Sequence, residues 1–293
     1  MNIHPRIARS PIAGALRAVA VAAGLALLSG TAIAAEEGAA VHHPEITAQK
    51  WSFAGPFGRF DKGQLQRGYK VYKNVCANCH SMKYVAFRNL SDEGGPGFTE
   101  EQVKAIAAEY KVTDGPNDDG EMFQRPARPS DRFPSPFPNE QAARVANGNA
   151  LPPDLSLMGK ARAAHRGFPG FVFDIFTQYQ ESGPDYVYSL LAGYTDAPHG
   201  QECASGLNYN KAFLAGACIA MAKPIEDGVV DYTDGTPATV ENYARDVSAF
   251  LMWTAEPKLE DRKRTGFKVM AFLIVFAGLL WFTKRKIWAD VAH

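Results

Sequence analysis

The sequence predicts a mainly α fold with long irregular loops, followed by one transmembrane helix at the C-terminal end. Three observations support this prediction. Several segments place apolar residues at helical spacing behind capping residues, segments with strand periodicity are scarce, and one long apolar run lies near the C-terminus. No internal repeat is visible, so we expect one domain ahead of that run.

The first 34 residues have the layout of a secretory signal peptide. Three arginines precede an apolar run that ends near Leu28, and the small residues Ala32-Ile33-Ala34 follow. The apolar run is too short to span a bilayer comfortably. We therefore expect a signal peptide over 1–34 with cleavage after Ala34; a retained N-terminal anchor is the alternative.

Four helices are predicted between the signal peptide and the C-terminal run. They are one behind Asp61 that continues through Cys76, one behind the capping box Thr99 to Gln102, one that follows Pro184 and ends at Gly193, and one opened by Thr236-Pro237 that continues to Leu251. Residues 112–140 are rich in Pro, Gly, Asp and Asn, which predicts an extended excursion on the surface.

The C-terminal apolar run, residues 265–283, is long enough to cross a membrane. Its one charge is Lys268, which can snorkel to the interface, and Trp281 suits the opposite boundary. A buried core helix is the alternative. Because a signal peptide commits the segment behind it to export, we expect 35–264 outside and 284–293 in the cytoplasm.

The zero net charge of the whole chain hides an acidic exported part. Residues 35–256 carry 20 basic and 28 acidic side chains. Such a segment is a poor nucleic-acid binder, and its acidity suits the docking of a basic partner. Net acidity that serves solubility alone would give the same count.

The pentapeptide Cys76-Ala77-Asn78-Cys79-His80 is the attachment signature for a c-type haem. Two thiols three residues apart can reach the two vinyl groups of one porphyrin, and the adjacent His80 can reach the iron. Zinc would prefer a second C-x-x-C, and a redox dithiol would need a βαβ context; the sequence has neither. We therefore expect one covalent haem c.

The sixth ligand of the iron is left open by the residues alone. Methionine sulfur raises the potential relative to a second imidazole. Met82 is too near His80 to reach the opposite face of the haem, Met252 lies among core residues of a predicted helix, and Met270 lies in the apolar run. The remaining candidates are Met122, Met158 and Met221. Met221 lies among small residues that let the backbone approach a porphyrin closely. His165 or His199 would give bis-histidine ligation instead.

From about Trp51 to Trp288, the chain resembles the cytochrome c1 family, the haem-bearing subunits of the cytochrome bc1 complex (ubiquinol–cytochrome c oxidoreductase). The matching stretches are Val71 to Tyr84, Ala150 to Ser156, Asp185 to Leu191, Ile219 to Ala222, Asp234 to Thr239 and Ala255 to Lys258. Between Ala163 and Gly183 the chain is longer than in mitochondrial members, which looks bacterial and leaves His165 aligned less securely.

The resemblance implies the haem site. It makes His80 and Met221 the axial ligands of the iron. It also implies that three residues line the haem pocket, namely Asn147, Pro152 and Tyr186, and that Arg162 pairs with a haem propionate. An ordinary solvated charge is the alternative for Arg162.

The resemblance also implies partners and a place in the cell. The Rieske iron–sulfur protein would reduce the haem, a basic cytochrome c, soluble or anchored, would oxidise it, and the anchor in membrane lipid would hold the chain beside cytochrome b. The expected location is the bacterial inner (cytoplasmic) membrane, with the haem domain in the periplasm. The chain alone would perform no bond chemistry; the complex, a quinol–cytochrome c oxidoreductase, would be the enzyme, and the chain one redox subunit of it.

Other functions remain open at this stage. They are a free-standing membrane-anchored electron carrier, a haem-based gas sensor with an open sixth position, and a peroxidase-like enzyme.

The two remaining cysteines, Cys203 and Cys218, are expected to form a disulfide. Unpaired thiols are uncommon in an oxidising compartment, and the haem would consume the other two cysteines. Buried free thiols and a bridge to another subunit are the alternatives.

Overall fold

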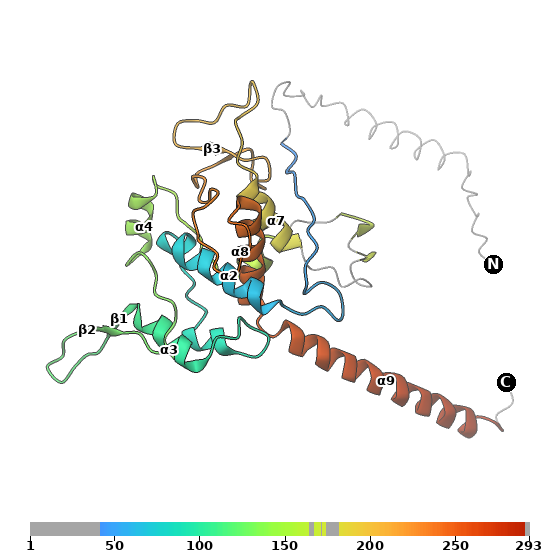
Figure 1. Cartoon of the computed structure of the whole chain (residues 1–293). Helices are drawn as coiled ribbons and strands as arrows, with labels where there is room; N and C mark the ends of the chain where they lie inside the picture. Colours follow the sequence, from blue (N-terminus) through green and yellow to red (C-terminus); the bar gives the residue numbers. More distant parts are fainter. Residues whose placement is uncertain (1–41, 164–166, 171, 174–181, 291–293) are drawn as a thin grey trace, which may run out of the picture. The chain divides into compact units, whose positions relative to one another are not determined.

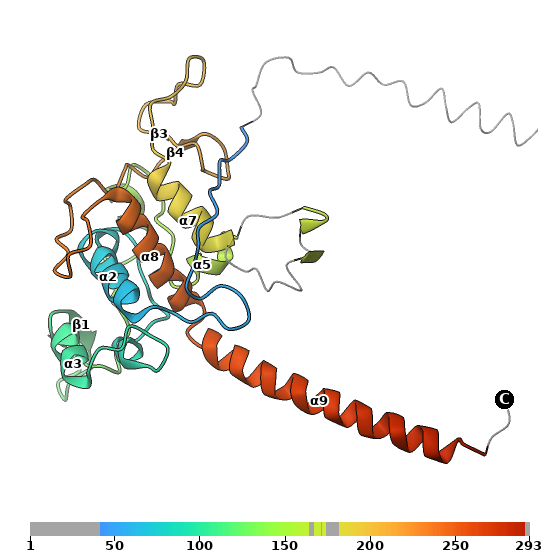
Figure 2. The ribbon, with the colours of Figure 1, turned by 45° about the vertical axis from the view of Figure 1, so that its right-hand side comes forward.

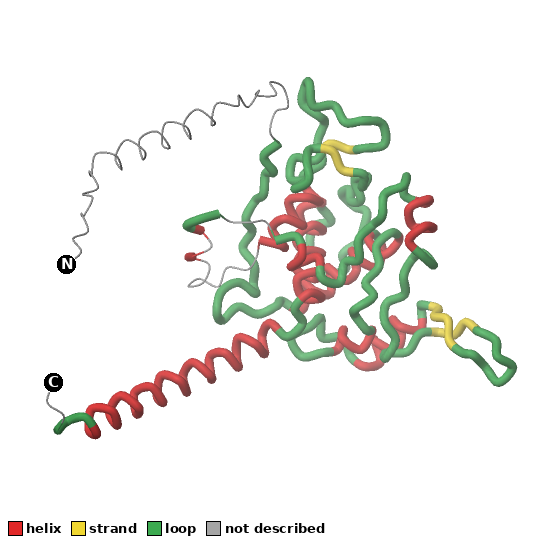
Figure 3. The backbone as a smooth tube through the Cα atoms, turned by 180° about the vertical axis from the view of Figure 1, so that it is seen from behind, coloured by secondary structure: helices red, strands yellow, loops and turns green. Residues whose placement is uncertain are grey.

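The structure is a computed structural model, and it describes residues 42–163, 167–170, 172–173 and 182–290. The predicted signal peptide, 1–34, lies outside the described residues. Helices dominate the regular structure, and irregular chain connects them (Figures 1 and 3). The predicted mainly α fold with long irregular loops is confirmed.

The described elements follow a simple order along the chain. They are α2 (Lys62–Asn74), η1 (Cys76–Asn78), η2 (Phe87–Ser91), α3 (Glu100–Ala108), β1 (Lys111–Asp114), β2 (Phe123–Pro126), α4 (Glu140–Ala146), α5 (Met158–Ala161), α7 (Ser182–Ala192), β3 (Asn208–Tyr209), β4 (Cys218–Ile219), α8 (Val240–Ala255) and α9 (Leu259–Ile287).

Helix α8 is the centre of the core, and α2, α5 and α7 all pack against it (Figure 2). Eleven of its sixteen residues are buried. Two glycines permit the close approach of its neighbours. A Cβ on Gly68 of α2 would lie 2.1 Å from the Asp246 carbonyl oxygen, and one on Gly159 of α5 would lie 2.6 Å from the Leu251 carbonyl oxygen. Any larger side chain at either position would push the helices apart.

An ion pair adds to the contact between α2 and α8. The Arg67 Nε lies 2.7 Å from the Asp246 Oδ2, and its Nη1 lies 2.8 Å from the Asp234 Oδ2. The Asp246 side chain is 3% exposed. Because an unpaired charge there would be costly, Arg67 stabilises the buried Asp246 carboxylate at the contact between α2 and α8.

Aromatic rings fill the core around α2 and α8. Neighbouring rings have centroids between 4.3 and 6.3 Å apart; the residues are Tyr69, Tyr72, Phe87, Phe133 and Phe250. These rings come from four separate segments of the chain, so the core holds the loops in place as well as the helices.

The segment from His42 to Phe53 is held along α7. The Gln49 N–H and the Trp51 Nε1–H both donate to the buried Asp185 Oδ1 at 2.8 Å, and the Thr47 N–H donates to Ser189 Oγ at 2.9 Å. This segment therefore covers one side of α7.

Regular structure interrupts the predicted surface excursion at 112–140. Strands β1 and β2 pair antiparallel, with Lys111 opposite Pro126 and Asp114 opposite Phe123. Arg125 joins the hairpin to the following loop, since its Nη1 lies 2.6 Å from the Asp131 Oδ2.

The capping residues were predicted better than the helix ends. Asp61 caps α2 and Thr99 forms the predicted capping box of α3, but α2 ends at Asn74 rather than continuing through Cys76. The predicted opening of α8 at Thr236-Pro237 is wrong. Thr239 is the N-cap, because its side chain accepts a hydrogen bond from the Asn242 N–H; Thr236 lies in the preceding turn, where its N–H donates to Asp234.

Helix α9 is longer than the predicted span and begins in contact with the domain. The Glu260 carboxylate accepts a hydrogen bond from the Phe60 N–H at 2.9 Å, and Lys263 Nζ donates to the Phe53 carbonyl at 2.7 Å. Among the described residues, α9 alone is long and apolar enough to cross a membrane. A cavity of about 590 Å³ opens beside its first turns, and none of the predicted site residues lines it.

Candidate haem site

The C-x-x-C-H segment forms a tight turn at the end of α2. The Val75 N–H closes the last turn of α2 on the Val71 carbonyl at 3.0 Å, and the chain then tightens into η1. The N–H groups of Cys79 and His80 both donate to the Cys76 carbonyl, at 3.2 and 2.9 Å. The three site residues thus share one short, hydrogen-bonded turn.

Both thiols of this turn are free, as covalent haem attachment requires. Cys76 is half-buried and Cys79 is exposed, whereas the other two cysteines of the chain are bonded to each other. Burial raises the pKa of the Cys76 thiol to about 12. Without a cofactor this side chain is therefore a neutral thiol facing partly apolar surroundings.

His80 presents one specific nitrogen for a metal. Its Nδ1 lies 2.8 Å from the Pro153 carbonyl oxygen. A carbonyl can only accept, so Nδ1 carries the proton and Nε2 keeps its lone pair. Burial lowers the pKa of His80, although the Pro153 hydrogen bond and the Asp154 charge oppose the shift. A neutral imidazole with a free Nε2 is the form that binds iron.

The chain around His80 is fixed by the segment that contains Pro152. The Leu155 N–H donates to the Ser81 carbonyl at 2.8 Å. Burial opposes ionisation of Asp154, but hydrogen bonds from the Lys83 N–H and from two serines outweigh it and lower the pKa. The Asp154 carboxylate is therefore charged.

Met221 is half-buried and packs against the core. Its backbone carbonyl accepts two hydrogen bonds, from the Tyr194 hydroxyl at 3.1 Å and from the Asn208 Nδ2 at 3.3 Å. Asn208 belongs to β3, which pairs with β4 just before the methionine. The position of Met221 is thus set by side chains from two other segments.

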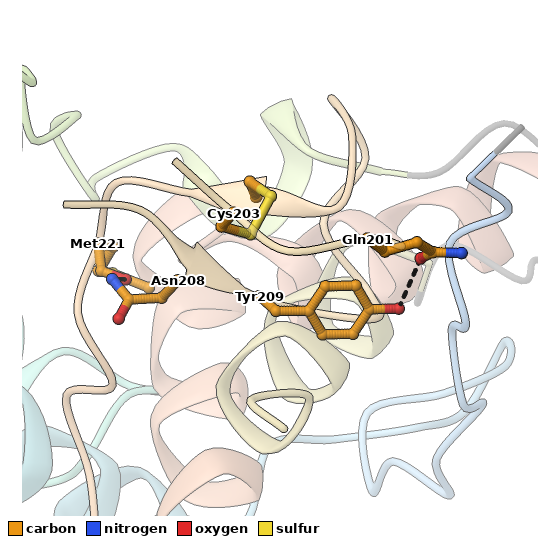
Figure 4. The surroundings of a disulfide bond; sticks show 6 residues. Gln201, Cys203, Asn208, Tyr209 and Met221 are labelled. Atoms are coloured by element: carbon orange, nitrogen blue, oxygen red, sulfur yellow. Dashed lines mark hydrogen bonds between the residues drawn. A yellow bond between two sulfur atoms is a disulfide. The ribbon is translucent and has the colours of Figure 1, made fainter. Parts of the chain in front are cut away.

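A disulfide closes the loop that leads to Met221. Cys203 and Cys218, which are 15 positions apart, are bonded, and this confirms the predicted pairing. Figure 4 shows the bond beside the β3–β4 pair, with Asn208 next to Met221 and the Tyr209 hydroxyl directed to Gln201. Cys218 itself lies in β4, opposite Tyr209.

The other candidate ligands are less suited to a buried iron. Met122 is 60% exposed on the β1–β2 connection, and His199 is exposed as well. Met158 is half-buried in α5 and remains the alternative candidate to Met221. His165 lies outside the described residues.

The structure brings together Tyr186 and Arg162. Tyr186 is 4% exposed on α7; burial raises its pKa, while the charge of Arg162 and the Leu214 backbone lower it. Arg162 is exposed at the end of α5. An exposed cation beside a buried phenol is an arrangement in which a carboxylate such as a haem propionate could be paired.

The haem contacts of Asn147 and Pro152 stay predictions. Asn147 ends α4, where its Nδ2 donates to the Ala143 carbonyl at 2.7 Å. Pro152 is half-buried directly before the residue that binds His80.

Sequence reasoning missed the residues that hold the two candidate ligands. They are Pro153, Asp154, Tyr194 and Asn208. Pro153 and Asp154 belong to a stretch that carried the family resemblance, but Tyr194 and Asn208 gave no local signal. Their role depends on contacts between segments that are distant in the sequence.

The site fits a covalent c-type haem better than a protein-held metal ion. Within the described part of the chain, no group of three or more His, Cys, Asp or Glu side chains could hold a metal. The free thiols, the Nε2 of His80 and a half-buried methionine are the groups that a c-type haem requires.

Comparison with known proteins gives consistent matches. Residues 51–291 match the Cytochrome C1 family. The cytochrome c1 of Blastochloris viridis is 47% identical over 270 residues, 92% of this chain and 95% of that protein. The mitochondrial protein named cytochrome c1-2, heme protein, of Solanum tuberosum is 47% identical over 282 residues, 93% of this chain and all of that protein.

One relative is much longer than this chain. The protein named cytochrome b/c1 of Bradyrhizobium diazoefficiens is 63% identical over 242 residues, which cover 82% of this chain. The matched region is 35% of that protein, so the chain spans about a third of its length.

Proposed function

The chain belongs to the cytochrome c1 family, and on that premise we propose that it is the electron-transfer haem subunit of a cytochrome bc1 complex. The observation that carries the proposal is the His80 Nδ1 bound to the Pro153 carbonyl, directly after two free thiols. That arrangement leaves one imidazole nitrogen for iron, beside the groups that would hold the porphyrin covalently.

Each site residue then has a separate task. Cys76 and Cys79 would hold the porphyrin through two thioethers, and the His80 Nε2 would bind the iron. The Met221 sulfur would be the second protein ligand, and its backbone is held by Tyr194 and Asn208. The bound haem supplies one reversible ferric–ferrous couple, so the chain carries one electron at a time.

The surrounding protein tunes this electron carrier. Tyr186 contributes an apolar, buried surface, while Arg162 offers a positive charge at the exposed edge. Burial and hydrogen bonds to the ligands set the potential of a haem site, in addition to the identity of the axial ligands. A sulfur ligand suits a high-potential carrier.

We further propose the partners. The electron comes from the Rieske iron–sulfur protein and leaves to a cytochrome c, soluble or anchored. Cytochrome b is the neighbour in the membrane. The Bradyrhizobium relative supports this neighbour, because its name joins b and c1 in one protein.

The location in the cell follows from the two ends of the chain. We propose that α9 anchors the protein in the bacterial cytoplasmic membrane through residues 265–283, with the haem domain, 35–264, in the periplasm and 284–293 in the cytoplasm. The exposed apolar side chains of α9 support the anchor. A signal peptide over 1–34 would direct the export.

Two experiments test the proposed function. A haem stain of a denaturing gel should mark this chain, and the purified membranes should show a c-type α band that titrates as one electron. The chain should also co-purify with a b-type cytochrome. A stain-free band would contradict covalent haem, and purification without cytochrome b would favour a free-standing anchored carrier. Carbon monoxide binding to the reduced form would favour a gas sensor.

A further inference from the structure

One carboxylate joins two segments of the candidate site that lie more than 70 positions apart. Asp154 follows Pro153, whose carbonyl binds His80. Its side chain turns back to the residues that follow His80 in the sequence. The stretch 153–154 thus contacts His80 through Pro153 and the residues that follow His80 through Asp154.

Both oxygens of this carboxylate are used. The Oδ2 accepts from the Ser81 hydroxyl at 2.8 Å and from the Lys83 N–H at 2.9 Å. The Oδ1 accepts from the Ser156 N–H at 2.9 Å, within its own segment. A charged acceptor strengthens each of these bonds relative to a neutral one.

Further hydrogen bonds make the junction rigid. The Leu155 N–H donates to the Ser81 carbonyl at 2.8 Å, and the Tyr84 N–H donates to the Ser156 Oγ at 3.1 Å. Ser156 is fully buried. Four hydrogen bonds therefore lock the two segments together beside the bond between His80 and Pro153, and two of these four end on Asp154. A third bond on Asp154, from the Ser156 N–H, lies within its own segment.

We propose that Asp154 is a positioning residue for His80. It fixes the Pro153 carbonyl against Nδ1 and thereby sets the orientation of the imidazole and the strength of that hydrogen bond. The inference rests on the proposed function, since it takes His80 as a haem ligand. Asp154 itself is not a ligand.

The expected sign of the effect follows from the chemistry of the ligand. A strong Nδ1–H to carbonyl bond makes the imidazole more electron-donating, which stabilises ferric iron. Weakening that bond raises the potential. Removing the nearby negative charge also raises it, because the ferric state carries the extra positive charge. The two effects must therefore be separated by the choice of variants.

The test uses the full-length chain matured with haem in its own membranes, and it compares Asp154→Asn with Asp154→Glu. The Glu variant keeps the charge but displaces the carboxylate by one methylene. The readouts are the midpoint potential of the haem and the g values of its low-spin ferric EPR signal, which report the orientation of the axial ligands. If Asp154 positions His80, both variants raise the potential and both shift the g values.

Asp227→Asn is the matched control. Asp227 also accepts from a backbone N–H, that of Val240 at 2.8 Å, and it is exposed in the loop before α8. The control should keep the parent potential and g values. The proposal is overturned if Asp154→Glu retains both parent values while Asp154→Asn raises the potential alone, since that result assigns Asp154 a charge effect only.

A milder variant keeps the test decisive if the Asp154 variants do not mature. Ser81→Ala removes one donor and leaves the carboxylate in place. It should shift the g values in the same direction by a smaller amount, and an unshifted signal would overturn the proposal. The parent chain is measured first: if it lacks a low-spin c-type haem, or if His80→Gly keeps one, the proposed function fails rather than this inference.

Discussion

A methionine can hold its sulfur at an iron only if the backbone behind it is fixed, and Met221 is fixed from two sides. Tyr194 follows α7 and Asn208 lies in β3, and both donate to the Met221 carbonyl. Met158, the half-buried alternative in α5, is held within its own short helix, where its N–H donates to the Leu155 carbonyl and its carbonyl accepts from the Arg162 N–H. The choice of Met221 over Met158 stays a prediction.

Replacing Met221 by Leu should lower the midpoint potential by on the order of hundreds of millivolts, because the identity of the axial ligand is a main lever on haem potential. The weak sulfur-to-iron charge-transfer band should disappear as well. Met158→Leu is the matched control and should leave both unchanged. If Met221→Leu kept the parent potential and charge-transfer band while Met158→Leu lost them, Met158 would be the ligand instead of Met221.

Tyr194→Phe should loosen the methionine without removing it. The variant deletes the hydroxyl that donates to the Met221 carbonyl at 3.1 Å but keeps the ring. Loss of one such bond costs about 1 kcal/mol. We expect the reduced haem of the variant to bind carbon monoxide, which the parent excludes, with a small fall in potential. Tyr209→Phe is the control, since its hydroxyl is directed to Gln201 instead.

Residues of the candidate haem site were predictable from the sequence where a short local motif carries the chemistry. The spacing of two cysteines and a histidine pointed to Cys76, Cys79 and His80 without any fold. Pro153 and Asn208 could not be predicted as supports, because they reach His80 and Met221 across 73 and 13 positions. Such contacts exist only after the chain has packed.

At the scale of elements, the β3–β4 loop depends on a covalent bond. The pair of strands has two residues on each side, which is too short to be stable alone. The loop is rich in glycine and asparagine, and the Cys203–Cys218 bond closes it just before Met221. The bond therefore restrains the segment that presents the methionine.

Replacing both Cys203 and Cys218 by Ala should destabilise the domain by about 3 kcal/mol in the chain-entropy account of a 15-residue loop. The methionine ligand should loosen, so the potential should fall and carbon monoxide should bind. Thermal unfolding and redox titration measure the two effects. Unchanged values for both would leave the bond without a role in the site.

The start of α9 is a second element whose role goes beyond its apolar length. A chain that ends after Arg264 keeps the contacts of Glu260 and Lys263 with the loop at 53–60, whereas a chain that ends after Lys258 loses them. Both should be released from washed membranes with haem attached. The shorter one should be less stable by about 1–3 kcal/mol. Retention of either chain in the membrane would place the anchor elsewhere.

The starts of α2 and α3 were predictable from their capping residues, whereas the start of α8 and the end of α2 were not. Thr99 and Asp61 each bond an N–H three residues on, a local interaction that the sequence displays. The end of α2 at Asn74 depends on the tight turn of the C-x-x-C-H segment. The predicted start of α8 at Pro237 is wrong, because Thr236 lies in a turn with Asp234 and the helix is capped by Thr239.

Charge is the property that belongs to the whole molecule. The 28 acidic and 20 basic side chains between residues 35 and 256 give a net negative domain. Three of the acidic side chains are exposed at two places. Glu93 lies beside the first turns of α9, and Glu100 and Glu101 lie in the first turn of α3. The sequence shows the sum of the charge, and the structure adds where these side chains are exposed.

The rate at which a basic cytochrome c oxidises this protein should fall steeply as salt rises. Opposite charges steer the encounter, and charges separated by more than about 8 Å are largely screened at physiological ionic strength. At low salt, Glu100→Gln with Glu101→Gln should slow the second-order rate several-fold. Glu93→Gln is the control and should not, because that side chain faces the α9 cavity near the proposed membrane surface. Stopped-flow oxidation at several salt concentrations measures these rates. A rate independent of salt would indicate an apolar docking surface, and a slower Glu93→Gln would move that surface towards the anchor.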